Sequence, residues 1–289
     1  MDYLSSILSL GAINAIAVLG LSIFTGFTGM FSLGHSAFVG IGAYVSAVLT
    51  YYYFVPFPLA LLGGSLSAGL ISCVVGAPAL RADLRSDYFA IAILGFGEAF
   101  RVAVENLDIT NGARGLPGLD PLSTPLWIFG SLGVCLLLAV NFVRSPLGRC
   151  CAAVREDPVA AQMAGVSLFR VRLGSLMVSA LLCGLSGGLM AHYLSFVQPS
   201  MFTLTQSTML LAAVIAGGMG SLSGPLIMSF LFVALPEALR VAQIWRLVAY
   251  GFVLVAMMIL RPSGLMGYRE LWDLIPRSLA WRCRRRAGA

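Results

Sequence analysis

Apolar runs of membrane-spanning length follow one another along almost the whole of this 289-residue chain. A helix needs about 20 mostly apolar residues to cross a bilayer, and fewer when it is packed inside a bundle. Only 10% of the residues are charged, whereas soluble domains carry about 25%, so the chain has too few charges to cover a water-facing surface. The sequence therefore predicts an all-α polytopic integral membrane protein. The candidate spans are Leu4–Phe24, Ser36–Phe54, Phe57–Leu80, Tyr88–Val104, Leu126–Val143, Leu173–Leu194, Thr205–Met219, Pro225–Arg240 and Ile244–Leu260.

These runs predict about nine transmembrane helices, within a range of about eight to ten. The number depends on Gly26–Gly42, a glycine-rich stretch that could hide a broken or re-entrant helix. Irregular backbone is tolerated at membrane depth only where protein buries it or where it lines a cavity.

Arginine supplies all 18 basic residues and sets the expected orientation. The loop Arg144–Arg172 holds five arginines, the tail from Arg261 onward holds seven, and four candidate spans separate the two clusters. An even number of spans places both clusters on one side, and the positive-inside rule makes that side cytoplasmic. We therefore expect the N-terminus outside and the C-terminus in the cytoplasm.

The complete absence of lysine excludes several kinds of chemistry. A P-loop needs its lysine on the nucleotide phosphates, and PLP enzymes need one for the Schiff base. We expect the chain to be no enzyme, to bind no cofactor or metal, and to leave ATP hydrolysis to partners. In so apolar a chain, the net charge of +6 indicates basic loops on an anionic lipid leaflet rather than a nucleic-acid partner.

The long cytoplasmic loop, residues 144–172, contains a predicted short helix. Asp157 suits the N-cap, Pro158 the first helical position, and Gly165 the C-terminal turn. Small side chains at Ala160 and Ala161 give this helix a smooth face, as expected of a docking element. The alternative is a solvated connector, although 29 residues is long for a connection.

The same helix resembles the coupling-loop motif of ABC-importer permeases, with an acidic residue, two alanines and a glycine. The whole chain is similar to the branched-chain amino acid permease family, in its LivM-type branch. The chain departs from the family in its short N-terminus, which leaves the number of early spans open. The other matching segments run in family order: TGFTGMFSLGHSAFVGIGAYVSAVL (Thr25–Leu49), YFAIAILGFGEAFRVAVENLDITNGARGLPGL (Tyr88–Leu119), AAVIAGGMGSLSGP (Ala212–Pro225), PEALR (Pro236–Arg240) and RPSGL (Arg261–Leu265).

The resemblance implies a type II-like ABC-importer permease bundle with a cytoplasmic coupling helix, in the bacterial inner membrane. Residues 1–260 would form the transmembrane permease domain, with an external loop at 105–125, and residues 261–289 would form a cytoplasmic basic tail. The implied partners are a second permease of the LivH type, two cytoplasmic ATPases that bind ATP and Mg, and a periplasmic binding protein.

The implied function is the import of leucine, isoleucine and valine from the binding protein. Urea, other amino acids and aromatic carboxylates remain alternative substrates. An ion-coupled secondary transporter is a further alternative, but it would need several buried carboxylates or a His–Asp relay, and only Glu98 lies well inside an apolar run. An intramembrane enzyme would need catalytic signatures that are missing from the sequence.

Candidate residues for the translocation path lie in two segments. Ser32, Gly34 and His35 form the centre of the glycine-rich stretch, where a broken helix could build a transport site. His35 could contact substrate or simply be satisfied by a helix end. Glu98 could line the path, or it could form a neutralising pair with Arg101 on the same helix face.

Two further sets of residues are assigned to partners through the resemblance. Residues of the coupling loop would contact the ATPases: Arg155, Glu156, Asp157, Ala160, Ala161 and Gly165. A turn-rich part of the external loop would dock the binding protein: Asn111, Gly112, Arg114 and Gly115.

Overall fold

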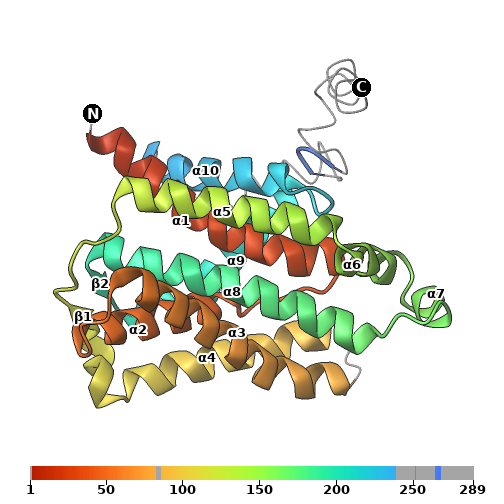
Figure 1. Ribbon diagram of the computed structural model, residues 1–289, viewed down its shortest axis with the longest axis horizontal. Coiled ribbons are helices and arrows are strands. Elements are labelled where there is room, and N and C mark those ends of the chain that lie inside the picture. The colour runs from red at the N-terminus through yellow and green to blue at the C-terminus, as the bar shows by residue number, and fades with distance from the viewer. Residues whose placement is uncertain (1, 83–85, 239–250, 252–263, 268–289) are drawn as a thin grey trace, which may run out of the picture.

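The computed structural model describes residues 2–82, 86–238, 251 and 264–267, and helices dominate this part of the chain (Figure 1). The α-helices are α1 (Asp2–Leu21), α2 (His35–Tyr51), α3 (Phe57–Arg81), α4 (Ser86–Glu105), α5 (Pro125–Arg144), α6 (Pro146–Glu156), α7 (Pro158–Met163), α8 (Leu168–Leu194), α9 (Leu204–Gly217) and α10 (Ser223–Ala238). The shorter elements are the π-helix η1 (Ser22–Gly26), the 3-10 helices η2 (Asp108–Thr110), η3 (Gly112–Arg114) and η4 (Pro199–Met201), and the strands β1 (Leu116–Pro117) and β2 (Phe196–Val197).

Five of the described helical segments are long and apolar enough to cross a membrane. They are α1 with η1, α3, α5, α8, and η4 with α9. The predicted runs in α2, α4 and α10 are also helical; α2 has 17 residues, and the apolar part of α10 is short. The polytopic all-α prediction is confirmed, whereas the ninth run, Ile244–Leu260, lies outside the described residues apart from Gly251.

Helix α8 lies at the centre of the bundle and packs against α1, α2 and α3 (Figure 1). Glycine permits this packing, because a Cβ at Gly187 would lie 1.9 Å from the carbonyl oxygen of Val39 in α2. A Cβ at Gly42 would lie 2.0 Å from the carbonyl oxygen of Gly184 in α8. Such close backbone contact is typical of membrane helices. In lipid no hydrophobic effect drives two helices together, so their association depends on small residues that let the backbones pack closely.

Two of the membrane passages are interrupted near the middle of the bundle. Residues 29–34 are non-helical, and α2 begins only at His35, whose Nε2 lies 2.8 Å from the Ser179 hydroxyl midway along α8. Residues 195–203 likewise reach the interior without regular α-helix before α9 begins. The first turns of α2 and α9 meet there, since the backbone N–H of Ser36 donates to the Ser207 hydroxyl at 3.0 Å.

The two interrupted helices run to opposite ends of the bundle. At one end of α2 the Tyr52 hydroxyl donates to the carbonyl oxygen of Ile109, beside the antiparallel pair of β1 and β2. Helix α9 ends next to Met219, whose carbonyl oxygen is bonded by Arg155 from α6. Figure 1 shows β1, β2 and the N-terminus at one end and α6 and α7 at the other. The strands and the α6–α7 loop therefore mark the two faces of the protein.

We predict that Gly187→Ala destabilises the fold by about 1–3 kcal/mol, because its added methyl group would force α8 away from the α2 backbone. Gly174→Ala is the matched control in the same helix, since a Cβ at Gly174 meets nothing within 4 Å. The measurement is thermal unfolding of the detergent-purified protein. Equal unfolding temperatures for the two variants would show that the α2–α8 contact is not tightly packed.

Candidate functional site

The loop between α5 and α8 forms two helices, α6 and α7, of which only the second was predicted. Asp157 caps α7 as expected, since its Oδ1 accepts from the N–H groups of Val159 at 2.8 Å and Ala160 at 3.0 Å. Gly165 ends α7 at φ +84°, which also confirms the predicted turn. The signal for α6 was Ser145 followed by proline, because the Ser145 hydroxyl accepts from the third residue on and proline suits the first turn.

The two loop helices pack onto the start of α8 through a small apolar cluster. Cys151 and Val154 of α6 contact Ala161 of α7 and Val171 of α8. Burial raises the pKa of the Cys151 thiol to about 12, so this cysteine stays protonated. Ala161 therefore faces the protein, whereas other predicted coupling residues are exposed to solvent: Glu156, Asp157, Ala160 and Gly165.

Arg155 joins the loop helices to the membrane bundle. Its Nη1 donates to the carbonyl oxygen of Gly26 at 2.6 Å and to that of Met219 at 2.8 Å. Gly26 ends η1, and Met219 lies in the turn between α9 and α10. Gly29, at φ +71°, passes close to the same side chain, where a Cβ would lie 3.2 Å from its Cγ. Arg155 thus lies against both interrupted passages rather than pointing only into solvent.

A cavity of about 360 Å³ lies beside Arg155 on this face of the protein. It opens between residues 28–30, where the chain leaves its first helix, the first residue of α4 and the two loop helices. Ser86 connects α4 to the chain before α2, because its hydroxyl accepts a hydrogen bond from the backbone N–H of Phe31 at 2.9 Å. The chain that leads into α2 is therefore held between α4 and α6.

The meeting point of α2 and α9 is flanked by a narrow hollow against α4. Two predicted path residues, Gly34 and Glu98, line it together with Ser36 and Phe202. The backbone is crowded here, since a Cβ at Gly34 would lie 2.1 Å from the carbonyl oxygen of Ile93 in α4. The sequence did not single out Ser36 or Phe202, because an ordinary serine or phenylalanine in an apolar run carries no local signal.

His35 is fully buried, and both of its ring nitrogens have hydrogen-bonding partners. Nδ1 lies 2.6 Å from the Ser32 hydroxyl, and Nε2 lies 2.8 Å from the Ser179 hydroxyl of α8. The ring also packs edge-on against Phe38, with centroids 5.4 Å apart. Of the two interpretations left open by the sequence, this geometry favours a histidine satisfied at a helix end, with Ser32 as its partner.

Glu98 forms the expected local pair with Arg101. Glu98 Oε2 lies 2.9 Å from Arg101 Nε, and Arg101 Nη1 lies 2.7 Å from Glu105 Oε1, so three charges share one helix face. The Glu98 side chain is 42% exposed on the surface of the chain, so it is not deeply buried. Glu105 can also pair with Arg101 because it lies four residues further along the same helix, which places both side chains on one face.

The other face carries the predicted docking loop. Asn111 has φ +59°, and Gly112 follows at φ +58°, so the chain turns sharply between η2 and η3. Arg114 is exposed, and Gly115 lets the loop approach β2, since a Cβ there would lie 2.2 Å from the Val197 carbonyl oxygen. The sequence thus predicted a turn-rich loop correctly, while its role in docking stays a prediction.

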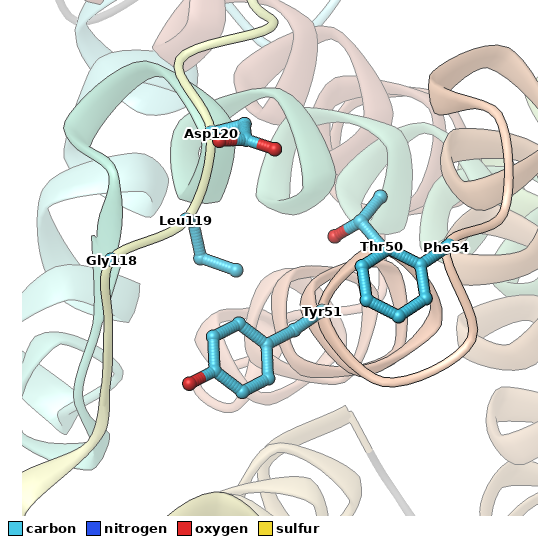
Figure 2. A pocket seen from close by; sticks show the side chains of 6 residues that line it. All are labelled: Thr50, Tyr51, Phe54, Gly118, Leu119 and Asp120. Carbon is cyan, nitrogen blue, oxygen red and sulfur yellow. The ribbon is translucent and has the colours of Figure 1, made fainter.

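A pocket of about 380 Å³ opens beside this loop, between the end of α2 and the chain that follows β1 (Figure 2). Figure 2 shows the Asp120 carboxylate and the Thr50 hydroxyl turned towards the gap, with the Leu119 side chain below Asp120 and across the gap from Thr50. The sequence analysis did not identify this pocket, because its walls come from segments far apart in the chain. Its lining is completed by Tyr51, Phe54 and Gly118.

Residues 3–261 match the family model described as "Branched-chain amino acid transport system / permease component". The LivM permease protein of the high-affinity branched-chain amino acid transport system of Escherichia coli K12 is 33% identical, over 90% of this chain and 69% of that protein. The LivH permease protein of the same strain is 23% identical over 91% of this chain and 94% of that protein. A probable LivM permease protein of Methanocaldococcus jannaschii is 23% identical over 69% of this chain and 66% of that protein.

No solved structure matches the chain significantly. The family model covers almost the whole chain, from the start of α1 to beyond α10, and the match to LivM covers 90% of it. The chain therefore belongs to the branched-chain amino acid permease family, in its LivM-type branch.

Proposed function

We propose that this chain is a permease subunit of an ABC importer that carries branched-chain amino acids across the bacterial inner membrane into the cytoplasm. The observation that carries this proposal is the 33% identity to the LivM permease protein over 90% of the chain. The all-helical membrane bundle with interrupted passages supports it, because such discontinuous helices are typical of transporters.

The proposed assembly contains a second permease, two cytoplasmic ATPases and a periplasmic binding protein. Similarity to both LivM and LivH proteins supports a pair of related permeases. ATP and Mg would bind to the ATPases, since this chain contains no lysine for a P-loop. The chain itself is proposed to be non-catalytic and to provide half of the membrane pathway.

The proposed topology has about nine spans, with the N-terminus outside and the C-terminus in the cytoplasm. It is supported by the arginines of the described cytoplasmic loop, which lie at the opposite end of the bundle from β1 and β2 (Figure 1). Arg81, at the end of α3, lies on the same face as this loop, because its guanidinium carbon is 5.5 Å from the centre of the Phe169 ring. The positive-inside rule makes this face cytoplasmic.

In the proposed mechanism, the loop docks on the ATPases through the exposed residues in and beside α7: Glu156, Asp157, Ala160 and Gly165. Movement of α6 then reaches the bundle through Arg155, whose hydrogen bonds to Gly26 and Met219 connect it to both interrupted passages. A guanidinium has several donors in a rigid plane, so one side chain can hold two carbonyl groups in a fixed relation. A displacement of α6 would thus move the cytoplasmic end of α9 and the chain leading into α2 together.

The proposed pathway passes the narrow hollow beside Gly34, Ser36 and Glu98. The hollow is closed in this structure, so passage requires α4 or the first turns of α2 and α9 to move. The first turns are linked by hydroxyl groups, with the Ser207 hydroxyl donating to that of Ser36 at 2.7 Å. Such short polar links separate and reform more readily than the tight glycine contacts between α2 and α8.

Reconstitution of the complete importer in vesicles tests the proposed function. We expect leucine uptake that needs both ATP and the loaded binding protein and that survives collapse of the proton gradient. Isoleucine and valine should compete with leucine, whereas urea and aromatic carboxylates should not. Uptake that stops when the proton gradient collapses, with ATP still present, would instead indicate an ion-coupled secondary transporter.

We further predict that Arg155→Met lowers transport by at least about tenfold while the ATPases still co-purify. The cavity beside Arg155 lets water reach the freed carbonyl groups, so the fold should survive the change. Arg149→Met, which removes an exposed charge from the same helix, is the control and should transport like the wild type. The measurement is stimulation of ATP hydrolysis by the loaded binding protein.

Two results would contradict the assignment of Arg155. Loss of the ATPases from the purified Arg155→Met complex would show that this residue docks the partner instead of transmitting its movement. Normal stimulation and transport in this variant would show that the bonds to Gly26 and Met219 are not needed for coupling.

A further inference from the structure

The pocket at the end of α2 is built from two segments that the fold brings together. Thr50, Tyr51 and Phe54 come from the end of α2 and the turn after it, and residues 118–120 come from the chain after β1. The pairing of β1 with β2 fixes these residues, since the backbone N–H of Leu119 also donates to the Ser195 carbonyl oxygen at 3.3 Å. The volume of about 380 Å³ lies within the range of small-molecule sites, about 300–1,000 Å³.

The Thr50 hydroxyl offers only a hydrogen-bond acceptor to this pocket. Its Oγ1 lies 3.0 Å from the carbonyl oxygens of Ser46 and Ala47 and 3.0 Å from His192 Nε2. His192 Nδ1 lies 2.9 Å from the Gly188 carbonyl oxygen, which can only accept, so Nδ1 carries the proton and Nε2 of the neutral ring accepts. All three neighbours are acceptors, and the single hydroxyl hydrogen of Thr50 is donated to one of them. The hydroxyl therefore has no hydrogen left for a ligand and can only accept from one.

The other groups around the pocket also favour a positive charge. The Asp120 carboxylate is an acceptor with a full negative charge, and it has no hydrogen-bond or ion-pair partner among the side chains of the described residues. Phe54, which is 86% exposed, places an aromatic ring at the rim, where it can contact a cation through its π face. The hydroxyl of Tyr51 points away from Asp120 and Thr50 (Figure 2).

An apolar wall completes the pocket. Leu119 is almost fully buried, and its side chain points into the pocket from the same side as Asp120 (Figure 2). The Phe54 ring lies on the side of Thr50. A ligand therefore finds an acceptor and an apolar surface on each side of the pocket. Asp120 and Leu119 lie on one side, and Thr50 and Phe54 lie on the other.

We propose that this pocket binds the ammonium group of a small apolar amine, and that in the importer this amine is the amino acid released by the binding protein. The ammonium group contacts Asp120 and Thr50, and the aliphatic side chain lies on Leu119 and Phe54. The substrate carboxylate faces outward, away from the negative charge of Asp120. This assignment rests on the proposed function for its substrate and for its external location.

Ligand-observed NMR on the complete importer in nanodiscs, without binding protein or ATP, tests the site. The probes are L-leucine, 3-methylbutylamine, which lacks the carboxylate, and 4-methylpentanoate, which lacks the amine. We expect saturation transfer to the two amines and none to 4-methylpentanoate. Equal transfer to 4-methylpentanoate and 3-methylbutylamine, or none to either amine, would overturn the proposal.

Asp120→Asn keeps the shape of the exposed side chain and should weaken amine binding by about tenfold, as expected for the loss of one charge-assisted hydrogen bond. Asp108→Asn removes an exposed carboxylate from the same face without touching the pocket, so it should bind as the wild type does. Unchanged amine binding in Asp120→Asn would overturn the proposal.

A lysine of the binding protein is the other possible source of an ammonium group. If Asp120→Asn weakens only the contact with the binding protein, and free amines do not bind to the wild type, the pocket receives that lysine and the proposal is wrong. The NMR measurement needs no transport. If amine binding depends on Asp120 but the importer does not carry leucine, the proposed function is wrong. The proposal that the pocket binds an amine would still stand.

Discussion

Non-helical backbone at the depth of the bilayer has to find its hydrogen-bonding partners inside the protein, because the hydrocarbon core offers none. Two such stretches occur in the described part of the chain, before α2 and before α9, and the described helices are arranged around them. Each leaves the first turn of a helix in the interior, with N–H groups that have no partner in their own helix. The Ser207 hydroxyl accepts from one of these groups, and the imidazole of His35 ties the start of α2 to α8. The polar groups near the centre of this membrane protein are therefore explained first by the needs of its own backbone.

The contacts that α2 makes with α8 differ in kind from those that it makes with α9. Helices α2, α3 and α8 touch along their backbones, and Gly187 or Gly184 could not gain a methyl group without moving a neighbour. Helix α9 meets α2 mainly through hydroxyl groups at its first turn, and its other end is held by Arg155. A transporter needs some contacts that persist and some that exchange. On this basis, the contact between α2 and α8 would persist during transport, whereas the contact between the first turns of α2 and α9 would exchange.

The sequence predicted what depends on local chemistry and missed what depends on distant contacts. Asp157 and Gly165 mark the two ends of α7, since capping involves residues two or three positions apart. The glycines of Gly26–Gly42 indicated a possible break before α2. The sequence also placed a gap between the spans before and after residues 195–204, but it gave no signal that this stretch reaches the interior. The contact made there joins Ser36 and Ser207, which are 171 residues apart in the chain. The inward position of Arg155 was missed for the same reason: its acceptors, Gly26 and Met219, are carbonyl groups that any residue carries.

The two faces of the protein are connected through the same interrupted passages. The chain from Gly29 is held near Arg155, reaches the centre at His35 and continues as α2 to Thr50, at the pocket on the opposite face. A helix transmits displacement along its axis because its backbone hydrogen bonds make it stiff, whereas the non-helical residues before it can bend. A shift of α6 would therefore act on the non-helical part of the passage, and α2 would carry the result to the pocket as a rigid body. Occupancy of that pocket would act on the same helix in the reverse direction, because coupling between two sites is reciprocal.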